Sequence, residues 1–175
     1  MIPETSHANQ VRLYSTSQYP LRWRVVRVLL SGKPFVDPTV FEHAGRWYMF
    51  VTLRGATSFL YLYTASSLVG PWIEHPQSPV VRADQQFGRP AGLPIVDNAG
   101  RLIRWAQDGR RMYGEAVYGV HILNLTETAY AERLLNSAPL VGPVAGSWHG
   151  YRAHHVSFHR LPELGNTWLS VVDGH

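Results

Sequence analysis

The sequence of 175 residues predicts an all-β domain built from repeated antiparallel hairpins. Stretches rich in aromatic and β-branched residues alternate with turns that contain Gly or Pro, and this composition is typical of strands. Helical patterns are scarce, and we expect a short helix only at 126–135 (TETAYAERLL), with Thr126 as its N-cap. With 45% hydrophobic residues, a chain of this length can bury a core as one domain.

The first expected elements are two strands within residues 11–30. A hairpin follows at 35–52 (FVDPTVFEHAGRWYMFVT), with a turn around Gly45. Its Asp37-Pro38 pair is unusual, because Asp is depleted from strands and Pro is confined to sheet edges, strand starts and bulges. We therefore expect the pair to mark the start of a strand that faces a cavity.

Three glycine-centred hairpins repeat along the chain, at Gly45, Gly100 and Gly165, which are 55 and 65 positions apart. Further strands are expected between these hairpins, at 58–64, 72–74 and 117–125. A unit of about four strands with a period of about 40 to 50 residues is typical of propeller blades. The sequence thus predicts a β-propeller-like fold with about three blades and a partial one, formed by residues 11–30, as a single truncated domain over 1–175.

Composition excludes several classes of protein. The 16 basic residues, of which only Lys33 is a lysine, are scattered and give a formal net charge of +4, so a nucleic-acid partner is not expected. The sequence has no cysteine, and therefore no disulfide or thiolate metal site. The first ten residues carry no signal-peptide pattern, and the longest aliphatic run is interrupted by Arg27. We expect a cytoplasmic protein without a membrane partner.

Several strings, in order, resemble the five-bladed propeller of glycoside hydrolase family 43 and, more closely, the N-terminal domain of the glucosamine inositolphosphorylceramide transferases. They are MIPET (1–5), VDPTVFEHAGRWYMF (36–50), SSLVGPWIEHP (66–76), GRPAGLPIVDNAGRLIRWAQD (88–108), YG (113–114), RAHHVSF (152–158) and VVDG (171–174). The resemblance implies that further blades precede MIPET in such relatives. It also implies that Arg89-Pro90 stands where family 43 hydrolases carry the general-acid Glu.

Catalytic candidates are the carboxylates that blade inner strands would bring to a central channel. Hydrolysis of a glycoside needs a proton donor and a second carboxylate on the other side of the bond. By its resemblance to the family's inner-strand Asp, Asp37 is the candidate base or modulator of the acid's pKa, and Glu115 or Glu4 is the candidate donor. Each has a structural alternative: Asp37 can cap backbone amides, and Glu115 can be a solvated strand end.

Substrate-binding candidates are the polar residues near the same strand ends. Arg89 and Arg152 can bind a phosphate or carboxylate bidentately, although surface ion pairs are the alternative. His154 and His155 would point to opposite faces of a strand, so that one of them faces the channel or holds a structural cation. No zinc-binding spacing occurs and no cofactor is expected. The remaining candidates are Gln107, Asp108, Tyr113 and Asp173; Asp108 is either a turn residue or a channel acid paired with an arginine.

Two functions remain open from the sequence. The first is a glycoside hydrolase acting on pentose or related glycosides through channel-facing carboxylates. The second is a non-catalytic glycan or sugar-phosphate binding domain of a glycosyltransferase-type protein. Because an open run of blades leaves apolar faces uncovered at both ends, we also expect a homodimer.

Overall fold

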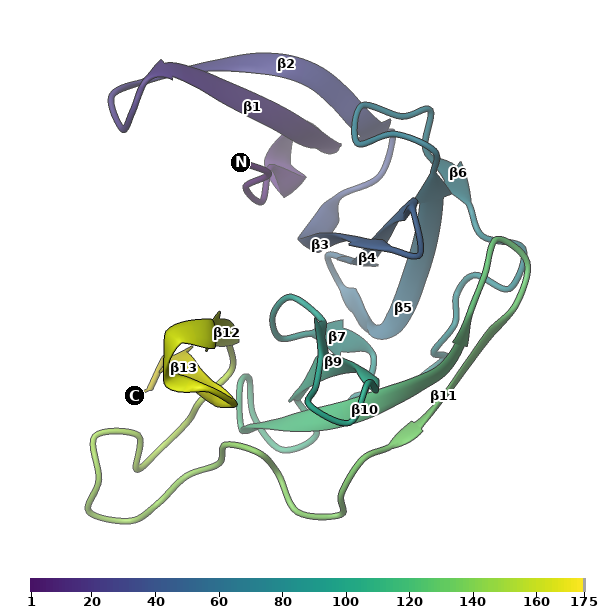
Figure 1. Ribbon diagram of the computed structural model, residues 1–175. Coiled ribbons are helices and arrows are strands. Elements are labelled where there is room, and N and C mark those ends of the chain that lie inside the picture. The colour runs from purple at the N-terminus through teal and green to yellow at the C-terminus, as the bar shows by residue number, and fades with distance from the viewer. Residues whose placement is uncertain (175) are drawn as a thin grey trace.

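Four antiparallel sheets follow one another along an arc in the computed structural model, which describes residues 1–174 (Figure 1). The hairpin of β1 (Gln10–Gln18) and β2 (Arg22–Ser31) forms the first sheet. The second contains β3 (Phe35–His43), β4 (Arg46–Leu53), β5 (Ala56–Ala65) and β6 (Ile73–Glu74). The third contains β7 (Arg89–Pro90), β8 (Ile95–Val96), β9 (Leu102–Asp108), β10 (Ala116–Leu125) and β11 (Tyr130–Leu134). The fourth is the hairpin of β12 (Val156–Leu161) and β13 (Thr167–Val172).

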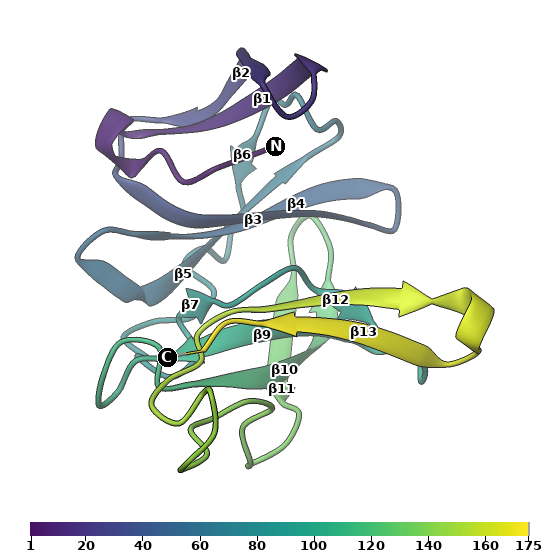
Figure 2. The same cartoon turned by 90° about the vertical axis from the view of Figure 1, so that its left-hand side faces the viewer.

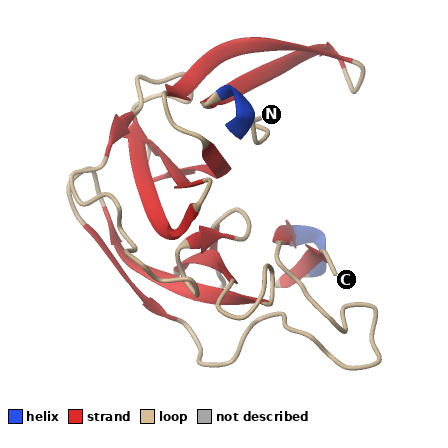
Figure 3. Ribbon diagram, turned by 180° about the vertical axis from the view of Figure 1, so that it is seen from behind, coloured by secondary structure: helices blue, strands red, loops and turns tan. Residues whose placement is uncertain are grey.

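Strands dominate the molecule (Figure 3), and the helical elements of residues 1–174 are two 3₁₀ turns, η1 (Ser6–Ala8) and η2 (Pro162–Leu164). The three glycine hairpins and the early strand pair are all present, one in each sheet. The predicted all-β, propeller-like fold is confirmed. No helix among the described residues is long and apolar enough to cross a bilayer.

The Asp37-Pro38 pair lies inside a bulge of β3. The pairing of β3 with β4 is in register up to Val36, shifts, and resumes at Thr39. Asp37 has a φ of 53°, a left-handed conformation that Asp tolerates better than most residues. A bulge leaves a residue outside the ladder and redirects its side chain, so a carboxylate and a proline are accepted here.

The helix expected at 126–135 is wrong, because this segment is a turn followed by β11. The hydroxyl of Thr126 accepts hydrogen bonds from the backbone N–H groups of Thr128 and Ala129 at 3.3 and 3.0 Å, which closes the turn. The chain then pairs with β10, with Tyr130 opposite Leu125. Thr126 is thus the capping residue of a hairpin rather than of a helix.

Three apolar clusters each join one sheet to the next. The first places Val11 and Leu30 against Met49 and Val51. The second joins the second and third sheets through contacts among Phe41, Phe50, Leu60, Leu62, Leu102 and Ile122. The third packs Val156 against Ile103, Trp105 and Val117. Face-to-face packing of successive sheets is the arrangement of propeller blades.

The first and last sheets lie at the two ends of the arc, and Figures 1 and 2 show open space between them. Large apolar side chains are exposed on both end sheets. They include Leu21, Val25 and Val26 on or beside the first hairpin, and Leu169 and Val171 on β13.

Candidate functional site

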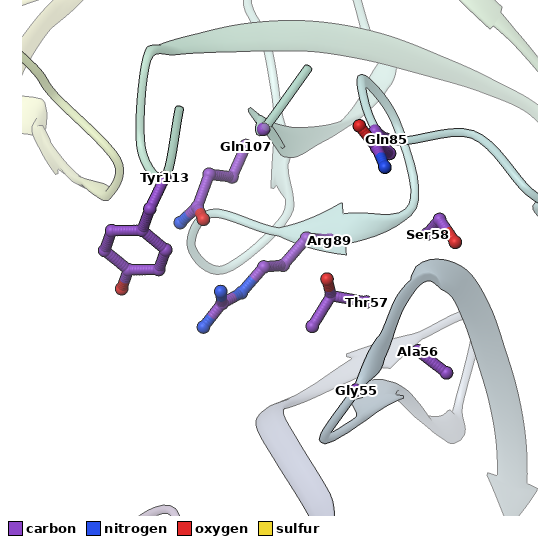
Figure 4. Close-up of a pocket in the computed structure, with 9 residues that line it drawn as sticks. Gly55, Ala56, Thr57, Ser58, Gln85, Arg89, Gln107 and Tyr113 are labelled. Atoms are coloured by element: carbon purple, nitrogen blue, oxygen red, sulfur yellow. The ribbon is translucent and has the colours of Figure 1, made fainter. Parts of the chain in front are cut away.

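A cleft of about 280 Å³ lies between the second and third sheets, and we call it the Arg89 cleft. The β4–β5 turn forms one wall, and the other comes from β7, the end of β9 and the turn beyond it (Figure 4). Its lining residues are Gly55, Ala56, Thr57, Ser58, Gln85, Arg89, Gln107, Gly109 and Tyr113. The lining is dense in amide, hydroxyl and guanidinium groups and contains neither a large aliphatic side chain nor a carboxylate.

Arg89 is held in this cleft by Asp37. Its Nε donates to Asp37 Oδ2 at 2.5 Å and its Nη2 donates to Oδ1 at 3.3 Å, so the pair is bidentate. Burial lowers the pKa of Arg89, but the hydrogen bond and charge of Asp37 outweigh it, and the pKa is raised. Glu4, exposed near the N-terminus, adds a smaller favourable charge. Both carboxylate oxygens of Asp37 are therefore engaged by one guanidinium.

The surrounding loops are tied together by backbone hydrogen bonds. Gly109 N–H donates to Gln85 O at 2.9 Å, and Asp84 N–H donates to Ser58 O at 3.0 Å. Arg89 lies opposite Gln107 in the short β7–β9 ladder. The Asp84–Ser58 bond ties the wall from the second sheet to the wall from the third sheet.

A second cleft of about 230 Å³, here called the Arg152 cleft, shares Tyr113 with the first. It is also lined by Arg152, His154, Asp173 and Gly174. The guanidinium carbon of Arg89 lies 4.8 Å from the centre of the Tyr113 ring, and the His154 ring centre lies 5.0 Å from it. Tyr113 thus stands between the two clefts, in contact with a candidate residue from each.

Asp173 organises the wall of the Arg152 cleft. Its Oδ1 accepts the backbone N–H groups of His154 and His155 at 3.0 and 2.7 Å, and its Oδ2 contacts Nδ1 of His154. Gln107 Nε2 donates to His154 O at 3.2 Å, which links this wall to the Arg89 cleft. The side chain of His155 is exposed and lines neither cleft.

The position of His154 depends on Gly114. Gly114 has a φ of 68°, and a Cβ placed on it would lie 2.6 Å from the Cβ of His154, which is closer than side chains tolerate. Beside this contact, Ala153 N–H donates to Gly114 O at 3.1 Å. The absence of a side chain at Gly114 therefore lets the last hairpin approach the third sheet.

The other candidate carboxylates are engaged elsewhere. Asp108 is buried and accepts both the backbone N–H of Arg110, at 3.0 Å, and its guanidinium, so it both fixes the turn and pairs with an arginine. Glu115 is buried and paired with Arg111, while its Oε2 has no hydrogen-bond partner among the described residues. Glu4 accepts a hydrogen bond from the Ser6 hydroxyl at 3.0 Å.

Of the predicted site residues, the two clefts bring together Arg89, Gln107 and Tyr113 in one group and Tyr113, Arg152, His154 and Asp173 in the other. Five predicted residues line neither cleft: Glu4, Asp37, Asp108, Glu115 and His155. Asp37, which was expected to face a cavity, reaches the Arg89 cleft only through its pair with Arg89. No cluster of three or more potential metal ligands is present in residues 1–174.

Sequence reasoning missed Thr57, Ser58 and Gln85 as cleft residues. The available signal was weak: Gly55 marks the turn between β4 and β5, and only β4 begins at the predicted Gly45 hairpin. Polar turns of this kind are common in sheets. This one lines a cleft only because the third sheet packs beside it, which the local sequence does not indicate.

Comparison with known proteins gives a consistent result over the whole chain. The family model described as "Glucosamine inositolphosphorylceramide transferase 1, N-terminal" matches residues 1–175. The chain is 32% identical over 180 residues to the rice (Oryza sativa subsp. japonica) protein named glucosamine inositolphosphorylceramide transferase 1, and 29% identical to the Arabidopsis thaliana protein of that name. Each alignment covers 99% of this chain but only 24% and 23% of those relatives, so the chain spans about a quarter of their length.

Among solved structures, Zg3597, a family 117 glycoside hydrolase produced by the marine bacterium Zobellia galactanivorans, has a similar fold, with a TM-score of 0.51 and 16% identity. The superposition covers 89% of this chain and 47% of the hydrolase chain, and at this identity it supports the fold alone. The resemblance to family 43 stays a prediction. The match to the transferase domain is confirmed, and the chain belongs to the family of glucosamine inositolphosphorylceramide transferase N-terminal domains.

Proposed function

We propose that this chain is a carbohydrate-binding domain of a glycosyltransferase-type protein, and that it binds its sugar in the Arg89 cleft. The observation that carries the proposal is the polar lining of that cleft, with a guanidinium, two side-chain amides, a phenol and two hydroxyls around one space. Such groups donate and accept hydrogen bonds in fixed directions and suit a ligand rich in hydroxyls. An apolar ligand would leave these groups unsatisfied.

Binding is better supported than hydrolysis. A hydrolase needs two carboxylates across the bond to be cleaved, about 5 Å apart for retention or about 6.5 to 9.5 Å for inversion. No carboxylate lines the Arg89 cleft, and Asp37, the candidate base beside it, has both oxygens in hydrogen bonds to Arg89. An arginine pairing of this kind stabilises a carboxylate as a structural anion.

The names of the relatives favour the same interpretation. They are named glucosamine inositolphosphorylceramide transferases, and this chain matches only about a quarter of their length. We assign to the present domain the recognition of a sugar or sugar phosphate within such a substrate, as distinct from the transfer step.

Isothermal titration calorimetry with a panel of neutral methyl glycosides tests the proposal. Gln85→Ala removes an exposed cleft amide whose side chain makes no hydrogen bond among the described residues, so it should weaken sugar binding several-fold without changing folding. Arg89→Lys keeps a charge for Asp37 but cannot both pair with Asp37 and present a further N–H group to the cleft, so it should weaken binding at least tenfold. Arg22→Lys, on the exposed β2 strand, is the control and should bind as the unaltered chain does.

Two results would contradict this function. One is the absence of binding by every neutral glycoside of the panel and also by glucose 1-phosphate. The other is release of the aglycone from synthetic aryl glycosides, abolished by Asp37→Asn, which would favour the hydrolase instead.

A further inference from the structure

The arginines around the two clefts differ in their pairing. Arg89 is paired with Asp37, Arg110 with Asp108 and Arg111 with Glu115. Arg152, in contrast, has no carboxylate within 4.0 Å among residues 1–174. Its Nε is buried and makes no hydrogen bond there, and its guanidinium carbon lies 5.2 Å from the centre of the Tyr151 ring. The Arg152 cleft therefore contains a guanidinium that no described carboxylate pairs with directly.

The one carboxylate of this cleft forms no ion pair with Arg152. Asp173 is already bound by two backbone N–H groups and by the His154 ring. A carboxylate that accepts several hydrogen bonds from fixed donors has little capacity left for a second cation. Exposed, unpaired arginines are common on surfaces, but a half-buried arginine in a concave wall has lost part of its hydration and gains more from an anion.

The shared Tyr113 places this cation next to the proposed sugar site. Arg89 and His154 both contact the Tyr113 ring, and Gln107 lines the Arg89 cleft while its amide bonds to the backbone of His154. One ligand can thus occupy both clefts, with a neutral part in the first and a charged part in the second. An arginine fork matches the geometry of phosphate and carboxylate oxygens.

We propose that the ligand is an acidic sugar whose phosphate or carboxylate group binds Arg152 while its hydroxyl groups occupy the Arg89 cleft. This inference rests on the proposed function, since it names the chemical class of the sugar bound there. Phosphate and carboxylate share the required chemistry, and separate probes distinguish them.

The test is calorimetric titration of the chain with methyl α-glucoside, glucuronate and glucose 1-phosphate. At least one acidic sugar should bind ten or more times tighter than the neutral glucoside. Arg152→Gln should remove this difference by lowering the affinity for the acidic sugar at least tenfold. Arg152→Lys, which keeps the charge but not the fork, should retain part of the preference.

Arg160→Gln is the matched control, because Arg160 lies on the adjoining β12 strand, is exposed, and loses the same unit of charge. Its preference for acidic sugars should equal that of the unaltered chain. Thermal unfolding of each variant shows whether it is folded under the titration conditions.

Three outcomes overturn the inference. Equal binding of neutral and acidic sugars refutes it but leaves the carbohydrate-binding function intact. Loss of the preference in Arg160→Gln as well as in Arg152→Gln shows a non-specific charge effect and also refutes it. Failure of all three probes to bind, by contrast, removes the proposed function itself.

Discussion

At the scale of single residues, Asp37 combines a left-handed backbone with a half-buried ion pair. Its φ of 53° lies in a region that costs most L-residues about 1–2 kcal/mol. The bulge in β3 turns its carboxylate to Arg89, which lies in the next sheet. One residue thereby fixes the orientation of the main cation of the Arg89 cleft.

Replacement of Asp37 by Asn isolates the charge, since Asn also tolerates the left-handed conformation. Arg89 would keep a neutral acceptor but lose its counter-charge in a partly buried site. We expect the free energy of unfolding, measured by urea denaturation, to fall by about 1–3 kcal/mol. In the control, Glu74→Gln removes the exposed pair with Lys33 and should cost less than about 1 kcal/mol. Equal losses in the two variants would contradict a structural role for the Asp37 pair.

We expect His75 to make the free energy of unfolding depend on pH. It is buried between the second and third sheets, where its Nδ1 accepts the Gln77 N–H at 3.1 Å and its Nε2 lies 3.2 Å from Thr126 O. Burial lowers the pKa of His75 below its ordinary value of 6.5, and the hydrogen bond to Thr126 opposes this only in part. The folded state therefore binds a proton less readily than the unfolded chain.

Stability contributed by neutral His75 is complete above about pH 6.5 and falls as the pH drops below that value. We expect the free energy of unfolding to decrease between pH 7 and pH 5, by no more than about 1.4 kcal/mol per pH unit from this group. His75→Gln should flatten the slope, whereas His159→Gln, at an exposed position, should not. An unchanged slope in His75→Gln would show that another group is responsible.

At the scale of elements, the last hairpin depends on close approach to the third sheet. Gly92 and Gly114 both leave room for it, since a Cβ at Gly92 would lie 2.0 Å from Val156 O. Val156 N–H donates to Ala91 O at 2.8 Å at the same place. The hairpin of β12 and β13 can therefore pack against the third sheet because Gly92 and Gly114 have no side chains. This packing also positions His154 and Asp173.

Gly114→Ala tests this seating. Gly45 has a similar φ of 75° with open space around it, so Gly45→Ala carries the backbone cost alone, about 1–2 kcal/mol. Gly114→Ala adds the clash with His154, so it should lower the melting temperature clearly more than Gly45→Ala does. It should also increase hydrogen exchange in β12 and β13, which Gly45→Ala should leave unchanged. Equal effects of the two substitutions would show that the close approach is unimportant.

Local patterns predicted the elements better than the site. The aromatic hairpin at 35–52 and the strands at 58–64 and 117–125 follow from composition and turn residues that lie close together in the sequence. A helix was wrongly predicted at 126–135. The Thr126 hydroxyl accepts a backbone N–H three residues on, at Ala129, and a Thr that caps a helix makes the same hydrogen bond. The contact of Asp37 with Arg89 spans 52 positions, and the resemblance supplied both residues without their pairing. Such a contact depends on the packing of two sheets, which no local pattern encodes.

At the scale of the whole molecule, the arc leaves its two end sheets without a neighbour on one side. Each apolar cluster joins two successive sheets, and the exposed Val25 and Val171 lie on strands of the end sheets. Apolar surface of this kind gains about 25 cal/mol for each Å² that it buries. Self-association stays a prediction for this chain.

We expect sedimentation at micromolar concentration to give a stable species of about twice the chain mass of 19.8 kDa. Val25→Glu should shift this species toward the single chain. Leu123→Glu, at an exposed position on β10 of the third sheet, is the control and should leave the mass unchanged. A single-chain mass at every concentration would contradict the dimer.

Because Tyr113 lines both clefts, we expect binding in one cleft to affect binding in the other. Its ring is one wall for both, so a ligand that orders the ring from one side also fixes its position for the other. Occupancy of either cleft then changes the affinity of the other by the same factor, because linkage between two binding equilibria is reciprocal. Two small molecules, a neutral sugar and inorganic phosphate, would bind this protein with measurable cooperativity even though neither touches the other.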